Sequence, residues 1–386
     1  MTAALAALVL LAVPSRAAAP ARRPAPPPSI EAELSSVVDL FYDLDFDRAQ
    51  KAADALEARY PGRPAGPFFR AAVAYQRWVA AGLPRDGSWT EVDRRLDEAI
   101  AEAKALEPSA PAEAHYYWGA ALGFRARGLA AQKRFVRALP SAAASLRQLK
   151  LALADDPTLL DARLGLGMYH YFAARMPPAA KPFAHLLVGE AGDRERGLLE
   201  LWSVARSTGP ARMEARAVLS MILSKDDEAD WAGADRLLSQ LMTRYPHNPL
   251  YRLRRAYVAE RRGRWAQAAA LAAPDGGWIE ALHPAIRARA RAQALYRAAE
   301  IELLRRRPQE AAAFLGELDD SVLPPELRGW ALLRRANLRD ALGDRAGALA
   351  DYRRVRGKAP LRAARAFERA PFPTGAPVIA PFFTGY

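Results

Sequence analysis

The sequence predicts an all-α protein built as a solenoid of about eight helical hairpins. Three observations predict it. A short pattern of glycine, alanine, an aromatic residue and proline returns along the 386-residue chain. No convincing run of alternating β-branched residues indicates a strand, and prolines repeatedly break the helical segments. With 51 % apolar residues, the chain has enough hydrophobic side chains to bury one face of every helix.

The junction between two hairpins is clearest in the stretch from Asp156 to Phe172. Pro157 ends one helix, because proline lacks the amide proton and clashes with the preceding turn. Gly167 then falls inside the next helix, where glycine costs about 1 kcal/mol relative to alanine. We therefore expect a second helix to cross closely over Gly167.

Copies of the pattern recur in register. The last copy has Gly343, Ala348, Tyr352 and Pro360, and the residues of earlier copies are Phe46, Ala49, Ala53, Leu56 and Pro61, then Trp231, Ala234, Leu238, Leu241 and Pro246, then Ala256, Gly263, Trp265 and Ala268. The Leu166-Gly167 pair also repeats Leu122-Gly123. Alanine at these places lets two helices approach closely, and bulky residues three or four positions away fill the space around it.

This pattern resembles the tetratricopeptide repeat (TPR), a two-helix unit of about 34 residues. The resemblance covers residues 30–360 and implies a right-handed α-solenoid that acts as a binding scaffold. The phrase from Asp156 to Tyr171, followed by Gly192 to Gly197, is similar to exported bacterial TPR proteins of unassigned role, and faintly to eukaryotic inclusion-body-clearance TPR proteins. Neither likeness brings a catalytic residue.

Turn residues and caps set the expected helices. Thr90 and Asp193 are expected N-caps, the segment from Pro108 to Pro111 is a break, and the proline-containing stretch 176–192 is expected to be a short irregular helix or a loop. The expected pairs are 30–44 with 47–60, 66–81 with 90–106, 112–130 with 135–154, 159–175 with a helix starting at 193, 213–223 with 231–244, 250–262 with 265–272, 284–306 with 309–318, and 325–342 with 345–355.

Both ends of the chain differ from the repeats. Residues 1–21 have an apolar run and then Ala19-Pro20-Ala21, which is typical of a secretory signal peptide cleaved after Ala21. Residues 22–29 form a Pro-rich linker. We expect a periplasmic or secreted protein with no transmembrane segment in the mature chain. Residues 361–386 alternate prolines with aromatic residues, so we expect a non-helical tail that either caps the last hairpins or recruits a partner.

The charge is strongly positive, with a formal net charge of +13 and arginines in clusters such as 252–264, 287–291 and 305–307. Such clusters suit an acidic protein or peptide partner. A composition rich in arginine and alanine without functional meaning is the alternative. The signal peptide argues against nucleic acid as a partner, and the oligomeric state stays open.

No catalytic or metal-binding motif is apparent. The five histidines, including His170, lack the spacing of metal ligands, and the acidic residues 226–230 lack the order of a calcium loop. We predict a non-enzymatic protein–protein interaction scaffold without a cofactor or a metal. The alternative is a solenoid that binds or processes a glycan or peptidoglycan strand.

The resemblance implies where a partner binds, because in TPR arrays the first helix of each hairpin lines the concave groove. The register gives inward positions that include Ala120, Asp161, Leu253, Glu260, Leu333 and Asp340. The residues selected as partner-binding are Tyr117, Phe124, Arg127, Leu164, Met168, Tyr171, Tyr257, Trp330 and Asn337. Aromatic residues mixed with arginine are common at binding centres, although each of these residues could instead pack against a neighbouring hairpin.

Overall fold

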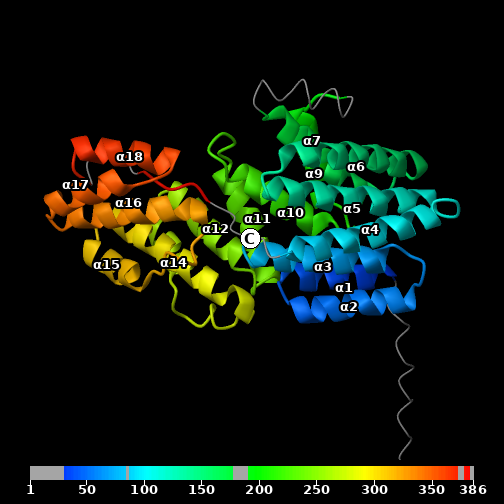
Figure 1. Cartoon of the computed structure of the whole chain (residues 1–386), viewed down its shortest axis with the longest axis horizontal. Coiled ribbons are helices and arrows are strands. Elements are labelled where there is room, and N and C mark those ends of the chain that lie inside the picture. Colours follow the sequence, from blue (N-terminus) through cyan, green and yellow to red (C-terminus); the bar gives the residue numbers. More distant parts are fainter. Residues whose placement is uncertain (1–29, 84–86, 177–189, 373–377, 383–386) are drawn as a thin grey trace, which may run out of the picture.

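The computed structural model describes residues 30–83, 87–176, 190–372 and 378–382. This part of the chain forms eight helical hairpins followed by a single helix, and it contains no strand (Figure 1). The hairpins are α1 (Ile30–Tyr42) with α2 (Phe46–Arg59), α3 (Ala65–Ala80) with α4 (Ser88–Leu106), α5 (Pro111–Ala131) with α6 (Phe135–Asp155), α7 (Arg163–Ala174) with α9 (Arg194–Ala205), α10 (Arg212–Leu223) with α11 (Trp231–Arg244), α12 (Pro249–Arg261) with α13 (Trp265–Ala272), α14 (Pro284–Leu304) with α15 (Pro308–Glu317), and α16 (Pro325–Ala341) with α17 (Arg345–Arg354). The predicted all-α solenoid of about eight hairpins is confirmed.

Local sequence explains where the helices begin. The second helices α2, α9, α11 and α17 each start after an aspartate whose carboxylate accepts a hydrogen bond from a main-chain N–H of the first turn. Prolines occupy the first turn of α5, α12, α14 and α16, where no helical N–H is needed. Asp193 is therefore confirmed as a cap. Thr90 is not one, because α4 already begins at Ser88 after Gly87.

The repeated alanines lie where the two helices of a hairpin touch. Ala49, Ala53, Ala234, Ala268 and Ala348 are all fully buried. A larger side chain at any of them would push the hairpin apart. The inference from small residues to close helix packing is thus confirmed in the first, fifth, sixth and eighth hairpins.

The repeated glycine lies in the turn between the two helices. Gly263 and Gly343 have φ of 69° and 90°, in the left-handed region where glycine carries no Cβ penalty. Lys133 and Arg306 adopt the same conformation at the turns of the third and seventh hairpins, with φ of 63° and 62°. These hairpins bear a local strain that their packing offsets, which is why the glycine signature is incomplete in the sequence.

The solenoid extends further toward the C-terminus than expected. Residues Lys358–Arg369 form α18, so the expectation of a non-helical tail from Leu361 onward is wrong for its first nine residues, 361–369. Ala363, Ala364 and Phe367 are buried while Arg362, Arg365 and Arg369 are exposed, which is an amphipathic helix pattern. The prolines that indicate an extended chain begin only at Pro371.

The described part of the tail beyond α18 lies on the array. Phe372 is buried against the ring of Phe367, with centroids 5.5 Å apart, and its N–H donates to the Asp340 carboxylate at 3.0 Å. Phe372 and Ala380 belong to the same buried cluster as Trp330 and Tyr352. The expected docking of the tail near Trp330 and Tyr352 is confirmed for these residues.

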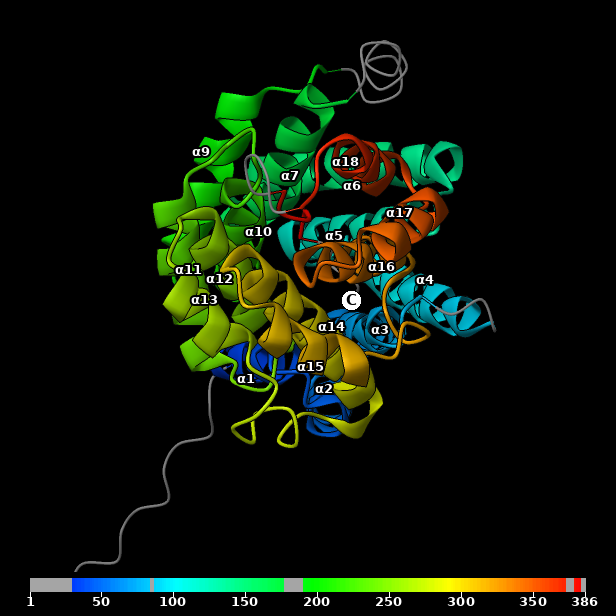
Figure 2. The same cartoon turned by 90° about the vertical axis from the view of Figure 1, so that its left-hand side faces the viewer.

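The first hairpin closes back on the middle of the chain (Figure 2). The Asp39 carboxylate accepts from Nε of Arg244 and from the Tyr245 hydroxyl, each at 2.8 Å. The Nδ2 of Asn248 donates to the carbonyl of Tyr42 at 2.7 Å, and Phe46 packs in one cluster with Ile286. The inner wall of the solenoid is therefore enclosed by the chain itself.

Three expectations fall outside the described residues. The signal peptide at residues 1–21 and the linker at 22–29 are among them, as is most of the stretch 176–192. Within the described residues, no helix is both long and apolar enough to cross a membrane.

Candidate functional site

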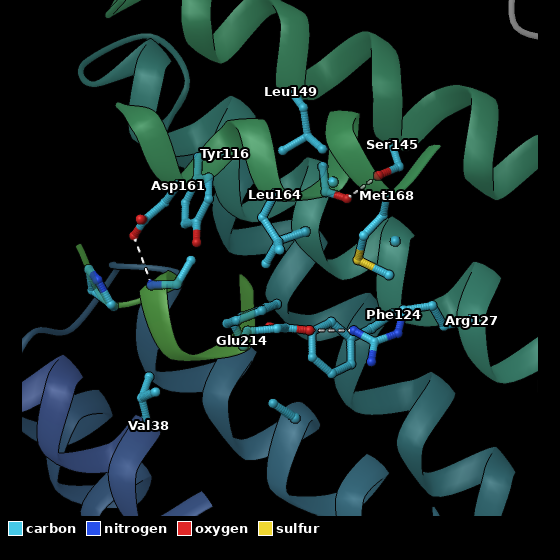
Figure 3. Close-up of a pocket in the computed structure, with 18 of the residues that line it drawn as sticks. Val38, Tyr116, Phe124, Arg127, Ser145, Leu149, Asp161, Leu164, Met168 and Glu214 are labelled. Carbon is cyan, nitrogen blue, oxygen red and sulfur yellow. Dashed lines mark hydrogen bonds and ion pairs between the residues drawn. The ribbon is translucent and has the colours of Figure 1, made fainter. Parts of the chain in front are cut away.

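The first helices of the N-terminal hairpins enclose a cavity of about 110 Å³ (Figure 3). Its walls come from α1, α3, α5, α7 and α10, with contributions from α6 and from a short 3-10 turn, η1 (Leu160–Ala162). The lining is mostly aromatic and aliphatic and includes Val38, Phe41, Phe68, Phe124, Leu149, Leu164 and Met168. The closure of the first hairpin forms one wall, because Val38, Phe41 and Tyr42 belong to α1.

One ion pair stands in this apolar wall. Arg127 of α5 donates to the Glu214 carboxylate of α10 at 2.6 Å, and its guanidinium lies 5.1 Å from the ring centre of Phe124. Burial opposes the charge of Arg127, but Glu214 outweighs it and raises the pKa of the guanidinium. Burial, together with the charge of Glu214, also raises the pKa of the Tyr42 hydroxyl well above its ordinary value. Arg127 therefore stays charged, and its ion pair with Glu214 holds α5 and α10 together.

A second carboxylate borders the cavity at Asp161. Its Oδ2 accepts from the main-chain N–H of Ala211 at 3.2 Å, whereas its Oδ1 has no hydrogen-bond partner among the described residues. Burial raises the pKa of this carboxyl group, and the N–H of Ala211 opposes the shift. Oδ1 faces Gly209, where an added Cβ would stand only 2.2 Å away. Asp161 thus fixes the start of α10 and does not point into the open space.

Four of the residues selected from the sequence meet at this cavity. Phe124, Arg127, Leu164 and Met168 line it, as do Ala120 and Asp161 from the same register. Tyr117 lies beside the cavity, where its ring packs 5.4 Å from that of Phe68. Tyr171 lies elsewhere, fully buried, with its hydroxyl donating to Glu228 at 2.9 Å. The structure therefore places Tyr117 and Tyr171 in packing between helices.

The inner wall of the C-terminal half holds the chain's own tail. Residues 378–382 run without secondary structure along α12, α14 and α16. The carbonyl of Val378 accepts from Arg334 at 2.5 Å, and the N–H of Ala380 donates to Glu300 at 3.0 Å. The ring of Phe382 lies 5.9 Å from that of Tyr257 and 4.9 Å from the guanidinium of Arg254. We call this surface the tail groove and define it by Arg254, Tyr257, Arg297, Glu300 and Arg334.

Three selected residues belong to this half. Tyr257 contacts Phe382 in the tail groove. Trp330 and Asn337 are buried behind it, and the amide of Asn337 accepts from Arg334 at 3.0 Å and donates to the Tyr352 hydroxyl at 2.9 Å. Trp330 and Asn337 therefore support the groove from below and offer no open surface to a partner.

A buried ion cluster forms the floor of the tail groove. The NH1 group of Arg297 donates to Glu260 and to Glu300, both at 3.0 Å. Glu300 also accepts from Nε of Arg334 at 3.2 Å and from the Tyr296 hydroxyl. Burial opposes the charge of Glu300, but Arg334 and Arg297 outweigh it and lower the pKa of its carboxyl group. In contrast, burial and the neighbouring Glu300 raise the pKa of Glu260.

We expect stability to depend on pH through Glu260. A folded-state pKa above the ordinary 4.5 means that the folded chain binds more protons than the unfolded chain as pH rises past that value. The stabilisation is thus present at low pH and lost as pH increases. The free energy of unfolding should fall more steeply between about pH 5 and about pH 8 in the native protein than in Glu260→Gln. Urea denaturation at both pH values checks this, with Glu310→Gln, an exposed site on α15, as the control. Parallel profiles for native protein and Glu260→Gln would contradict it.

Sequence reasoning missed the charged partners of both sites. Glu214 was not predicted as a site residue, because its hairpin lacks the Leu-Gly pair from which the repeat register is assigned. Arg297, Glu300 and Arg334 gave one usable signal, since Arg297 and Glu300 are three residues apart in the mostly apolar stretch 294–304 of a long helix. Buried charges in such a helix need partners from another helix.

The remaining polar residues serve structural contacts. His170 is fully buried, with Nδ1 at 2.5 Å from Glu200 and Nε2 at 3.1 Å from Glu190. Glu228 of the acidic stretch contacts Tyr171, Arg175 and Arg194. Over the described ranges, no group of three or more histidine, aspartate or glutamate side chains has the arrangement to hold a metal ion.

Many clustered arginines are engaged within the chain. Arg255 and Arg262 both pair with Asp235, and Arg291 pairs with Glu317. Arg252 and Arg287 donate to main-chain carbonyls. These arginines of the clusters are therefore engaged in contacts within the described part of the chain.

Comparison with known proteins adds a distant structural similarity and no sequence match. No protein-family model matches the chain, and no curated protein matches it. Among solved structures, a tetratricopeptide repeat protein from Parabacteroides merdae ATCC 43184 is similar at 15 % sequence identity, with 78 % of this chain and 98 % of that chain covered and a TM-score of 0.33. The TPR-like description of this chain therefore rests on its own hairpins, alanines and turns.

Proposed function

We propose that the protein is a non-catalytic helical-repeat scaffold that binds an extended segment of another protein in the tail groove. The observation that supports this most directly is residues 378–382, which already occupy the groove as an extended segment. Their contacts are of the kind that an intermolecular peptide ligand makes, namely main-chain hydrogen bonds combined with side-chain seats.

Some of the contacts to the tail segment supply affinity for an extended backbone, and others supply specificity for side chains. The bonds from Arg334 to the carbonyl of Val378 and from Ala380 to Glu300 involve only main-chain atoms of the segment. Any extended chain can make them, whatever its sequence. The buried seat of Ala380 and the site of Phe382 between Tyr257 and Arg254 depend on side-chain size and shape. The groove thus combines general affinity for an extended backbone with selection at two positions.

The alternative of a glycan-binding or glycan-processing solenoid finds less support. Acid–base catalysis on a glycan needs two carboxylates that converge on an open polar cleft. Glu214 and Asp161 are the carboxylates at the cavity, and they are held by Arg127 and by the N–H of Ala211. Both carboxylates are thereby committed to structure, so we propose a binding role without chemistry.

An acidic partner is not required at the tail groove. Arg297 and Arg334 already pair with Glu260 and Glu300, and Arg254 lies against the uncharged ring of Phe382. The resident segment 378–382 occupies the groove without a charged side chain. Any contact between an acidic partner and exposed arginines elsewhere on the solenoid is a separate matter.

The proposed place of action is the cell envelope or the medium. The apolar run and Ala19-Pro20-Ala21 motivate it. N-terminal sequencing of the protein expressed in a bacterium is expected to begin near Arg22, and recovery of the cytosolic protein with Met1 would contradict export.

We expect the groove to bind its own tail segment as a separate peptide once the resident tail is removed. Ala380 is fully buried, so a tryptophan at this position does not fit its site. The tail of the full chain carrying Ala380→Trp should therefore stay out of the groove and leave it empty. A fluorescently labelled peptide of residues 371–386 should then bind saturably in an anisotropy titration. Ala366→Trp on the exposed face of α18 is the matched control. No binding to the Ala380→Trp protein, with the native circular dichroism spectrum retained, would contradict the proposed function.

A further inference from the structure

The ion pairs that form the floor of the tail groove do not depend on the tail segment. If the tail leaves, Glu300 keeps its hydrogen bonds from Arg297 at 3.0 Å and from Arg334 at 3.2 Å. Arg334 keeps its bond to the amide of Asn337 at 3.0 Å. The cluster of Glu260, Arg297, Glu300 and Arg334 keeps its ion pairs, so release of the segment avoids the large penalty of an unpaired buried ion within it, and Arg254 alone gives up its contact with the ring of Phe382.

The resident segment is held lightly. Among residues 378–382 only Ala380 is buried, whereas Val378, Ile379 and Phe382 keep part of their surface exposed and Pro381 is exposed. Their main-chain contacts to the described part of the chain are two hydrogen bonds to charged side chains, and such a bond contributes about 1.5–3 kcal/mol net. These few contacts are those of a segment that can exchange with a competitor.

Because the segment is covalently attached to the solenoid, it occupies the tail groove although its contacts there are few. Covalent linkage over a short stretch of chain supplies an effective concentration of about 1 mM. A segment with an intrinsic Kd of about 100 μM would then occupy the groove about 90 % of the time and would weaken binding of an external segment about tenfold.

The groove also specifies the chemistry of its occupant. The seat of Ala380 admits only a small side chain, and its N–H is needed for the bond to Glu300. Two residues later the site between Tyr257 and Arg254 favours an aromatic ring, which both stacks and receives the guanidinium. Beyond Phe382 an open space of about 280 Å³, bordered by Met221, Ser224 and Lys225, leaves room for the chain to continue.

We infer that the protein partner presents an extended, uncharged segment with a small residue two positions before an aromatic one, and that residues 378–382 are a tethered competitor that this segment displaces. This inference rests on the proposed function and adds to it the identity of the recognised segment and the control of access.

The competition is measured by titrating the labelled 371–386 peptide into four forms of the full chain. The Ala380→Trp protein should bind at least about tenfold more tightly than the native protein and the Ala366→Trp control. Phe382→Ala in the chain, a milder change that keeps the groove intact, should give an intermediate gain. Equal affinity for all forms would overturn the competitor role while leaving the proposed function standing. Absence of binding to every form would overturn both.

The chemistry of the segment is measured with altered peptides and the Ala380→Trp protein. The peptide changes Ala380→Trp and Phe382→Ala should each weaken binding about tenfold or more. The change Pro381→Ala, at an exposed position, should alter it by less than about threefold. If the peptide binds equally well without the small residue and the aromatic ring, the assigned chemistry is wrong although the groove still binds.

Discussion

Replacing Arg334 with methionine is expected to destabilise the C-terminal hairpins by about 3–5 kcal/mol. Arg334 is 1 % exposed, and its loss leaves Glu300 with Arg297 as its one remaining ion-pair partner. Methionine fills much of the same volume, so the effect should come from the incompletely compensated Glu300 carboxylate and not from a cavity. Urea denaturation followed by circular dichroism gives the change in the free energy of unfolding.

Arg335 provides the matched control for this substitution. It is adjacent on α16 and pairs with Asp320 at 2.5 Å, but both side chains are partly exposed. Surface ion pairs of this kind contribute about 0–1 kcal/mol. Arg335→Met should therefore stay within that range, and comparable losses from both substitutions would show that burial of the Glu300 cluster is not the cause.

Replacing Gly167 with leucine is expected to cost about 1–3 kcal/mol. The crossing helix inferred from the sequence is α9: a Cβ on Gly167 would stand 3.0 Å from the carbonyl oxygen of Gly197 and 3.0 Å from Cγ of Leu201. Gly197 faces it in the same way, since a Cβ there would stand 2.5 Å from the N atom of Tyr171. The two glycines let α7 and α9 meet backbone to backbone, and a leucine must separate them.

Gly316 offers the control for the packing at Gly167. It lies in α15, and a Cβ at this position would meet nothing within 4 Å. Gly316→Leu should be neutral or stabilise by up to about 1 kcal/mol through helix propensity alone. If Gly167→Leu left the melting temperature unchanged, the register that places Leu164, Met168 and their neighbours would lose its basis.

The repeat signature predicts the hairpins because each alanine or turn glycine meets a requirement of the local backbone, namely close helix packing or a left-handed turn. Ala348 and Gly343 report a close helix crossing and a left-handed turn, and both needs are met within about 34 residues of chain. The repeat register also selected Phe124, Arg127, Leu164 and Met168, which all line one cavity in the structure. It failed for the span of α18, where a proline-rich neighbourhood concealed the periodic Ala363, Ala364 and Phe367.

The partners across the inner wall could not be found in this way. Glu214 meets Arg127 only because α1 to α10 curve around a common space, and the curvature is the sum of small rotations between hairpins. Tail residues Val378 and Ala380 meet Arg334 and Glu300 for the same reason. A local sequence pattern does not contain the summed rotation between hairpins. It therefore predicts residues that match a repeat position but not their long-range partners.

Closure of the first hairpin on the α11–α12 region has a consequence during synthesis of the chain. Asp39 and Arg244 are 205 residues apart. At roughly 5–20 residues per second, the surface of α1 that carries Asp39 and Tyr42 waits about 10–40 s for its counterpart to be made. Each hairpin of an open repeat array meets its neighbour almost at once. Here the first hairpin emerges with part of its final contact surface uncovered, and that surface stays open to other contacts until the sixth hairpin begins.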